Sequence, residues 1–169
     1  ITIVVNINNP KLMRDIIDLI KPLYNPKNID KPTTPKFIIS KKSADLSILL
    51  KNAREEMGTD DSIPLAEVDE KSLEKIIQYM NKWNGEQPPE IEKPLKSSIL
   101  KEVTDEWSAD FIDNMDLEEL TNITVSANFM EITPLLDLAC AKLASMCKDK
   151  TEEEIFKSFG IVDTFSEEE

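Results

Sequence analysis

Residues 125–140 read VSANFMEITPLLDLAC, and they decide the fold of the carboxyl-terminal half because one helix ends and another begins within them. Upstream, Asp116 occupies a helix-capping position, with the acidic Glu119 three residues later. Pro134 follows Thr133, and proline suits the first turn of a helix, where no N–H is needed. We therefore predict two successive helices. Their inward residues are Leu117, Leu120, Ile123 and Ala127 in the first, and Leu135, Leu136, Ala139, Leu143 and Met146 in the second.

Further helices are predicted on either side of this pair, including one near the start of the chain that carries Leu12, Ile16, Leu19, Ile20 and Leu23. Thr151 and Glu154 have the spacing of a capping box, and they precede a short apolar helix that Gly160 ends. Residues 44–57 predict another helix, with Gly58 as its C-terminal cap. Asp69 is expected to cap a further helix. Its apolar residues recur at intervals of three and four, as a half-buried helix requires: Leu73, Ile76, Ile77 and Met80.

Short strands are predicted in the amino-terminal half. Residues 2–7 are rich in β-branched side chains, and residues 37–40 predict a second strand. Residues 63–65 predict a third, at a sheet edge because Pro64 cannot donate to a ladder. A few short strands followed by many helices predict an α+β fold with a small sheet. We expect one part from 1 to 106, with an insertion at about 9–35 and an exposed loop at 84–106, and a helical part from 107 to 169.

The charge balance excludes some classes of partner. The chain has 33 Asp and Glu against 20 Lys and Arg, a net charge of -13. Binding to nucleic acid depends on clustered cations that neutralise phosphates, and anionic membranes attract cations for the same reason. We therefore expect neither nucleic acid nor a membrane as a partner. No apolar stretch reaches the roughly 20 residues that span a bilayer, and the first residues lack the layout of a signal peptide.

The residues that usually carry catalysis are scarce. There is no histidine, and the three glycines are too scattered to form a phosphate-binding loop. Cys140 and Cys147 lie two helical turns apart, roughly 10 Å, which is too far for a disulfide. The acids at 152–154 suit the positive end of a helix dipole better than a catalytic pair. We predict a protein that is not an enzyme, holds no cofactor or metal, and works in a reducing compartment, the cytoplasm and nucleus.

The carboxyl-terminal half also resembles a known family. The segments that carry the resemblance are 107–111 (WSADF), 125–132 (VSANFMEI), 134–140 (PLLDLAC), 150–155 (KTEEEI) and 159–165 (FGIVDTF). In this order and spacing they are similar to the S-phase-kinase-associated adaptors of SCF ubiquitin ligases, proteins of the BTB/POZ fold. The resemblance implies a BTB/POZ-like fold with a C-terminal helical extension. It also implies an adaptor that links an F-box protein to a cullin.

The resemblance implies two binding surfaces. The cullin surface would include Asn128 and Phe129, because an exposed aromatic ring beside an amide suits an interface. The residues alone allow the alternative that Phe129 is in the core and Asn128 caps a turn. The F-box surface would be an apolar face, for which the alternative is again ordinary core packing. Its candidates are Leu136, Cys140, Leu143, Ile155, Phe159, Ile161 and Phe165.

Other functions stay open at this point. An elongin-C-like adaptor shares the expected fold but lacks the extension that residues 151–165 resemble. A divergent BTB module could bind an F-box or associate with itself without a cullin, so a homodimer is a further expectation when no F-box is bound. A carboxylate enzyme would need a buried acidic pair in a deep cleft. The chain also departs from the family at Glu152, where the family often has a proline.

Overall fold

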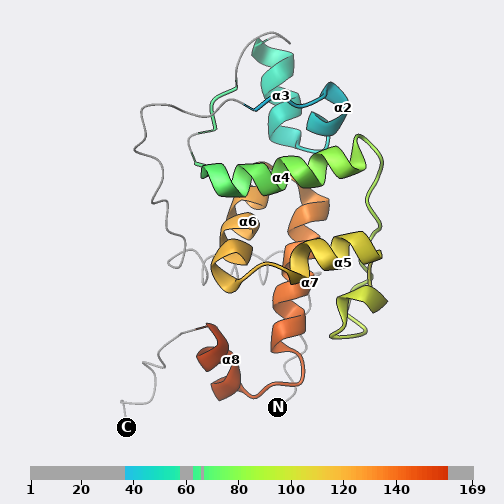
Figure 1. The fold of residues 1–169 in the computed structure, drawn as a ribbon, viewed down its shortest axis with the longest axis vertical. Helices are drawn as coiled ribbons and strands as arrows, with labels where there is room; N and C mark the ends of the chain where they lie inside the picture. The colour runs from blue at the N-terminus through green and yellow to red at the C-terminus, as the bar shows by residue number, and fades with distance from the viewer. Residues whose placement is uncertain (1–36, 58–62, 66, 160–169) are drawn as a thin grey trace.

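The structure is a computed structural model, which describes residues 37–57, 63–65 and 67–159. Its regular elements in these ranges are helices (Figure 1). The helices are α2 (Lys41–Ala44), α3 (Ile48–Met57), α4 (Glu70–Trp83), the 3-10 helix η2 (Leu100–Glu102), α5 (Glu106–Asp113), α6 (Leu117–Phe129), α7 (Thr133–Cys147) and α8 (Glu152–Phe159). Across the described ranges no residue is in a β-strand, so the prediction of an α+β fold with a small sheet is wrong for this part of the chain.

Two of the predicted strands fall within the described residues, and neither forms. Residues 37–40 are irregular and lead into α2, and Ile38 is 97% exposed. Residues 63–65 are also irregular. β-Branched side chains favour a strand only where a neighbouring strand pairs with it, and no described segment offers one. The third predicted strand, at 2–7, lies outside the described residues, as does the predicted insertion at about 9–35.

Aspartate caps set the starts of three helices. Asp69, Asp105 and Asp116 each accept a hydrogen bond from the backbone N–H three residues later, at 3.0, 3.0 and 2.8 Å. Such a cap stabilises a helix by about 1 kcal/mol, because it satisfies an otherwise unpaired donor. The predicted starts at Asp69 and Asp116 are confirmed, whereas the cap at Asp105 was not predicted.

The helix predicted over 44–57 begins only at Ile48, because Ala44 is the last residue of α2 and residues 45–47 are not helical. Between α2 and α3, Ser47 accepts a hydrogen bond from the N–H of Leu50 at 3.1 Å. Its hydroxyl also donates to the carbonyl oxygen of Met130 at 2.5 Å, beyond the end of α6. Serine competes well for backbone groups at helix ends, so one buried side chain both starts α3 and ties it to a distant helix.

The packed centre of the molecule is the α4–α6–α7 unit. α6 and α7 lie side by side, α4 crosses their upper end, and α5 packs against α7 (Figure 1). Ile76, Met80, Ile123 and Leu135 are almost completely buried there, and each contributes about 1.5–3 kcal/mol through removal from water. One hydrophobic cluster includes residues from both sides of position 106. The boundary predicted there, between the amino-terminal part and the helical part of the chain, stays a prediction.

The end of α4 is fixed against α2. Asn84 adopts a left-handed conformation, with φ of 45°, and its side-chain oxygen accepts hydrogen bonds from the hydroxyls of Ser40 and Ser43. Gly85 follows with φ of +89°, and a β-carbon there would lie 3.3 Å from that of Lys42. The turn therefore needs glycine for its backbone angle, and space beside α2 is limited as well.

Residues 84–99 contain turns and bends, and they are fastened to α7. Pro88 and Ile91 are buried beneath exposed neighbours. Lys93 forms an ion pair with Asp137 of α7 at 2.9 Å. At the end of α7, the Lys148 ammonium donates to the carbonyl oxygen of Lys96 at 2.8 Å and lies 3.5 Å from that of Leu95. Much of the segment predicted as an exposed loop therefore has fixed contacts.

None of the helices in the described ranges combines the length and apolar character that crossing a bilayer requires. Among the same residues, no three Cys, Asp or Glu side chains gather in a group that could hold a metal ion.

Replacing Lys148 by Met tests the attachment of this loop. The change keeps the length of the side chain but removes its donors to the two carbonyl groups. We expect the free energy of unfolding to fall by about 1 kcal/mol and the melting temperature to fall by about 2–4 °C. The backbone amides of residues 92–97 should also exchange faster with solvent. Lys150→Met is the control, because the hydrogen bond of its ammonium is to Ser158, at 3.3 Å, and not to the loop. Equal effects of the two variants would contradict the attachment.

Candidate protein-binding surfaces

The corner between α6 and α7 is a tight helix-ending turn. Glu131 has a φ of 52°, and its N–H donates to the carbonyl of Asn128 at 3.2 Å. The N–H of Ile132 donates to the carbonyl of Ala127 at 2.9 Å. These two bonds around a left-handed residue form a Schellman motif. Ala127 and Ile132 are fully buried, as expected for the apolar contact that accompanies this motif.

Asn128 and Phe129 lie in the last turn of α6, just before this corner. Both are exposed, and Phe129 keeps 37% of its surface open to solvent. Met130, next in the chain, is fully buried. The structure therefore excludes the alternative that Phe129 is a core residue. Contact of these two residues with a cullin stays a prediction, and the corner offers the exposed ring and amide that it requires.

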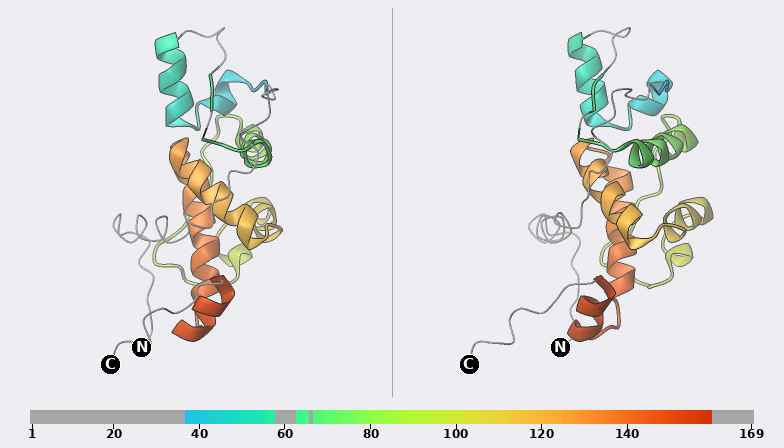
Figure 2. Two further views of the ribbon diagram at one scale, coloured as in Figure 1. Left: turned by 90° about the vertical axis from the view of Figure 1, so that its left-hand side faces the viewer. Right: turned by 60° about the vertical axis from the view of Figure 1, so that its left-hand side comes forward.

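The junction of α7 and α8 is set by the predicted capping box, which is confirmed. The N–H of Thr151 donates to the Glu154 carboxylate at 2.9 Å, and the N–H of Glu154 approaches the Thr151 hydroxyl at 3.3 Å. α8 then packs back on the core through Phe159, which is buried, and Ile155, which is half-buried. In Figures 1 and 2, α8 lies at the opposite end of α7 from α3.

The predicted F-box residues divide by burial. Cys140, Leu143 and Phe159 are 1%, 3% and 7% exposed, so they pack within the chain. Leu136 and Ile155 are half-buried against the same cluster and keep part of their surface open. Ile161 and Phe165 lie outside the described residues. The structure thus brings five of the seven candidates onto α7 and α8, and their contact with an F-box stays a prediction.

Both cysteines are free thiols of low reactivity. Burial raises the pKa of Cys140 to about 12, an effect to which the negative charge of Asp137 adds. Burial also raises the pKa of Cys147, and Lys150 partly opposes that increase. The thiolate is the nucleophilic form, so these residues behave as small apolar groups of α7 at neutral pH.

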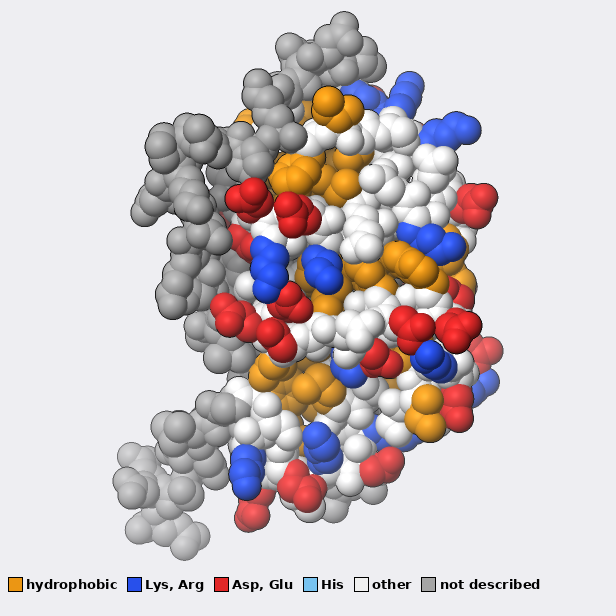
Figure 3. All heavy atoms as spheres, viewed as in Figure 1, with side chains coloured by type: hydrophobic (Ala, Val, Ile, Leu, Met, Phe, Trp, Pro, Cys, Tyr) orange, Lys and Arg blue, Asp and Glu red, His pale blue; other side chains and the backbone are white. Residues whose placement is uncertain are grey.

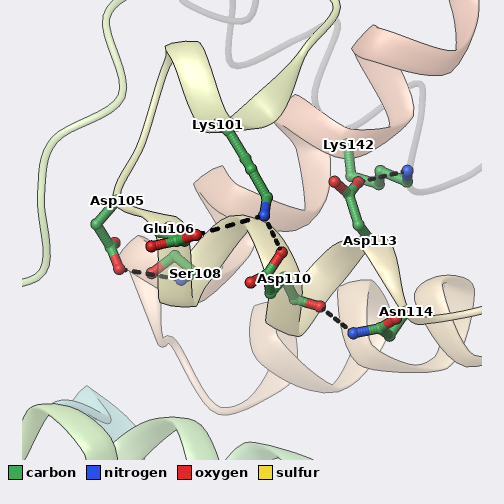
Figure 4. A network of polar contacts seen from close by, with 8 residues as sticks. All are labelled: Lys101, Asp105, Glu106, Ser108, Asp110, Asp113, Asn114 and Lys142. Atoms are coloured by element: carbon green, nitrogen blue, oxygen red, sulfur yellow. Dashed lines mark hydrogen bonds and ion pairs between the residues drawn. The ribbon is translucent and has the colours of Figure 1, made fainter.

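The carboxylates around α5 form ion pairs instead of a catalytic pair (Figure 4). Lys101 of η2 lies 2.7 Å from Asp110 and 3.7 Å from Glu106, while Lys142 of α7 lies 2.7 Å from Asp113. The three acidic side chains are between 40% and 83% exposed, whereas a hydrolytic pair needs buried carboxyls with separated pKa values. On the face shown in Figure 3, acidic and basic side chains are interspersed.

Sequence reasoning missed several residues that shape these surfaces. Ser47 ties α3 to the α6 end, Lys148 holds the 84–99 segment, and Ile48 is exposed beside the corner. The serine had a readable signal, because it stands before the apolar run at 48–50 as an N-cap does. Lys148 and Ile48 had no such signal in the sequence, since their roles depend on segments that only the folded chain brings together.

Two family models match the chain. The one described as "Skp1 family, tetramerisation domain" matches residues 34–85, which include α2, α3 and α4. The one described as "Skp1 family, dimerisation domain" matches residues 133–169, which begin with α7 and α8.

Individual proteins are also similar over most of the chain. An S-phase kinase-associated protein 1 homolog of Tetrahymena thermophila is 46% identical over 131 residues, which are 78% of this chain and 79% of that protein. The E3 ubiquitin ligase complex SCF subunit sconC of Arthroderma otae is 36% identical over 132 residues, 78% of this chain and 79% of that protein. At this identity and coverage, the chain belongs to the Skp1 family.

Proposed function

We propose that this chain is the adaptor subunit of an SCF-type E3 ubiquitin ligase and that it links an F-box substrate receptor to a cullin. Membership of the Skp1 family and similarity to SCF subunits support this function. The observation that carries it is the exposure of Phe129 in the last turn of α6, at the start of α7, whose other end leads into α8. A linking protein needs two surfaces that do not overlap, and the separation of Phe129 from α8 is consistent with that requirement.

The contribution of the adaptor is geometric, and it needs no catalytic group of its own. α7 has 15 residues and is therefore about 22 Å long. It begins at the corner beside Phe129 and ends where the chain turns into α8. Because most of its inward side chains are buried against α6, the helix can act as a fixed spacer between the two partners. We therefore propose a protein that binds and positions and does not catalyse.

At the proposed cullin surface, Phe129 supplies apolar area and Asn128 supplies a hydrogen-bonding amide. Aromatic residues are frequent among the few that dominate the energy of an interface. The backbone beneath them is fixed by the Schellman motif, so little order has to be gained on binding.

At the proposed F-box surface, we assign the direct contacts to the half-exposed Leu136 and Ile155 and, as sequence-based candidates, to Ile161 and Phe165. Cys140, Leu143 and Phe159 form the buried layer that supports them. An apolar helical face of an F-box would cover the open parts of Leu136 and Ile155, as helices do in an apolar groove.

Self-association is a second property that a specific observation favours. The two matching family models are described by their dimerisation and tetramerisation, and they cover both ends of the described chain. Apolar surface meant for a partner can also bind a second copy. We expect a homodimer when no F-box is present and a single copy when one is bound, which light scattering after size exclusion measures directly.

Phe129→Ala tests the cullin surface. We expect the dissociation constant for purified cullin to rise about 10- to 30-fold, because a buried aromatic contact would be lost, with F-box affinity unchanged. The matched control is Ile99→Ala, another exposed apolar residue, 57% exposed and outside this corner. Calorimetric titration gives both constants. Full cullin affinity in the Phe129 variant would refute the assignment.

Ile155→Ala tests the F-box surface. We expect about a 5- to 10-fold loss of F-box affinity, because part of the apolar contact is removed, and no change in cullin affinity. Since Ile155 also packs on the core, the melting temperature is measured beside the binding. Lys157→Ala, an exposed position on the same helix, is the control. An effect on cullin instead of F-box would reverse the assignment.

A further inference from the structure

The first turn of α3 is joined directly to the corner that carries Phe129. The Ser47 hydroxyl donates to the carbonyl of Met130 at 2.5 Å, and the N–H of Ile48 approaches the carbonyl of Glu131 at 3.4 Å. Both acceptors follow Phe129 immediately in the chain. As a result, α3 extends beyond the carboxyl end of α6 (Figure 2). Surface residues of this turn and of the corner are therefore neighbours.

Exposed apolar residues gather at this junction. In the described part of the chain, four large apolar side chains are exposed: Ile38, Ile48, Ile99 and Phe129. Ile48, at 46%, and Phe129, at 37%, belong to the two helix ends that meet here. The next residues of α3 point inward, since Leu49 is half-buried and Leu50 is 7% exposed. The exposure of Ile48 thus belongs to one face of α3 that the other described residues leave uncovered.

A charged residue completes this face. Lys51 lies one turn after Ile48, and residues three apart on a helix are neighbours on its surface. It is exposed, and within the described ranges it forms no ion pair, unlike Arg54 in the next turn, which pairs with Asp45. Among the described residues, this face therefore presents an apolar side chain next to a cation that has no ion pair.

We propose that the cullin surface continues from Phe129 onto the first turn of α3, where Ile48 contacts an apolar side chain and Lys51 an acidic side chain of the cullin. This inference rests on the proposed function. Two arguments support it: this surface is continuous with the corner that carries Phe129, and a stable interface needs a larger area than that corner alone offers. A stable interface covers about 800 Å² on each partner, more than two side chains supply, so the cullin must also contact surface beside Asn128 and Phe129. Ile48 is the exposed large apolar residue joined to that corner.

The position of α3 favours the cullin over the F-box as the occupant. α3 and α8 lie at opposite ends of α7 (Figure 1). An F-box bound near α8 would have to extend along the whole of α7 to reach Ile48. A cullin bound at Phe129 would lie next to Ile48, because two hydrogen bonds join the start of α3 to the residues that follow Phe129.

Two variants of the full chain test the inference, Ile48→Ala and Lys51→Glu. We expect Ile48→Ala to raise the dissociation constant for cullin about 5- to 10-fold, and Lys51→Glu to raise it by a similar factor at low salt and less at high salt. F-box affinity and the melting temperature stay unchanged, since both side chains are exposed. The matched controls are Ile99→Ala and Lys41→Glu, exposed residues of the same types elsewhere.

The outcomes separate this inference from the proposed function. Loss of cullin affinity in Phe129→Ala but not in Ile48→Ala or Lys51→Glu would overturn the extension and leave the adaptor function standing. Full affinity in all three variants would overturn both. A change in oligomeric mass by light scattering in Ile48→Ala, with cullin affinity intact, would assign this face to a second copy of the chain and overturn the inference.

Discussion

The structure depends on the close packing of α6 against α7 through the corner that joins them. The left-handed Glu131 and the two backbone hydrogen bonds around it reverse the chain, and the buried Ala127 and Ile132 hold the reversal in the core. Other described helices are positioned against this pair. α4 crosses its upper end, α5 packs on α7, and Ser47 attaches α3 to the corner. Protein interiors are packed as densely as crystals, so this unit holds the helices that pack on it in fixed positions.

This constraint explains how a small acidic chain can act as a linking protein. The proposed cullin surface lies where α6 ends, and the proposed F-box surface lies where α7 gives way to α8. The two are separated by the length of one buried helix, so binding at one end need not disturb the other. The chain has no need of a catalytic group for this task, because the spacing of its partners is what it contributes.

The local parts of the fold were predictable, and the non-local parts were not. Asp69, Asp116 and the Thr151–Glu154 box identified three helix starts, since a cap acts on donors within three residues. The strands at 37–40 and 63–65 were wrong, because a strand depends on a partner that composition does not reveal. For the site, the resemblance indicated Phe129, and the ring is exposed as a binding residue must be. Ile48 and Lys148 could not be predicted, because their positions depend on contacts with residues far away in the chain.

The central claim is that one copy of this chain holds two partners on separate surfaces. The most direct test measures the dissociation constant for cullin with the chain alone and with the chain saturated by an F-box protein. The account predicts values equal within about twofold, and a complex with one copy of each component by light scattering. A cullin affinity that falls as F-box is added, with no ternary complex, would show that the two partners share one surface and would contradict the account.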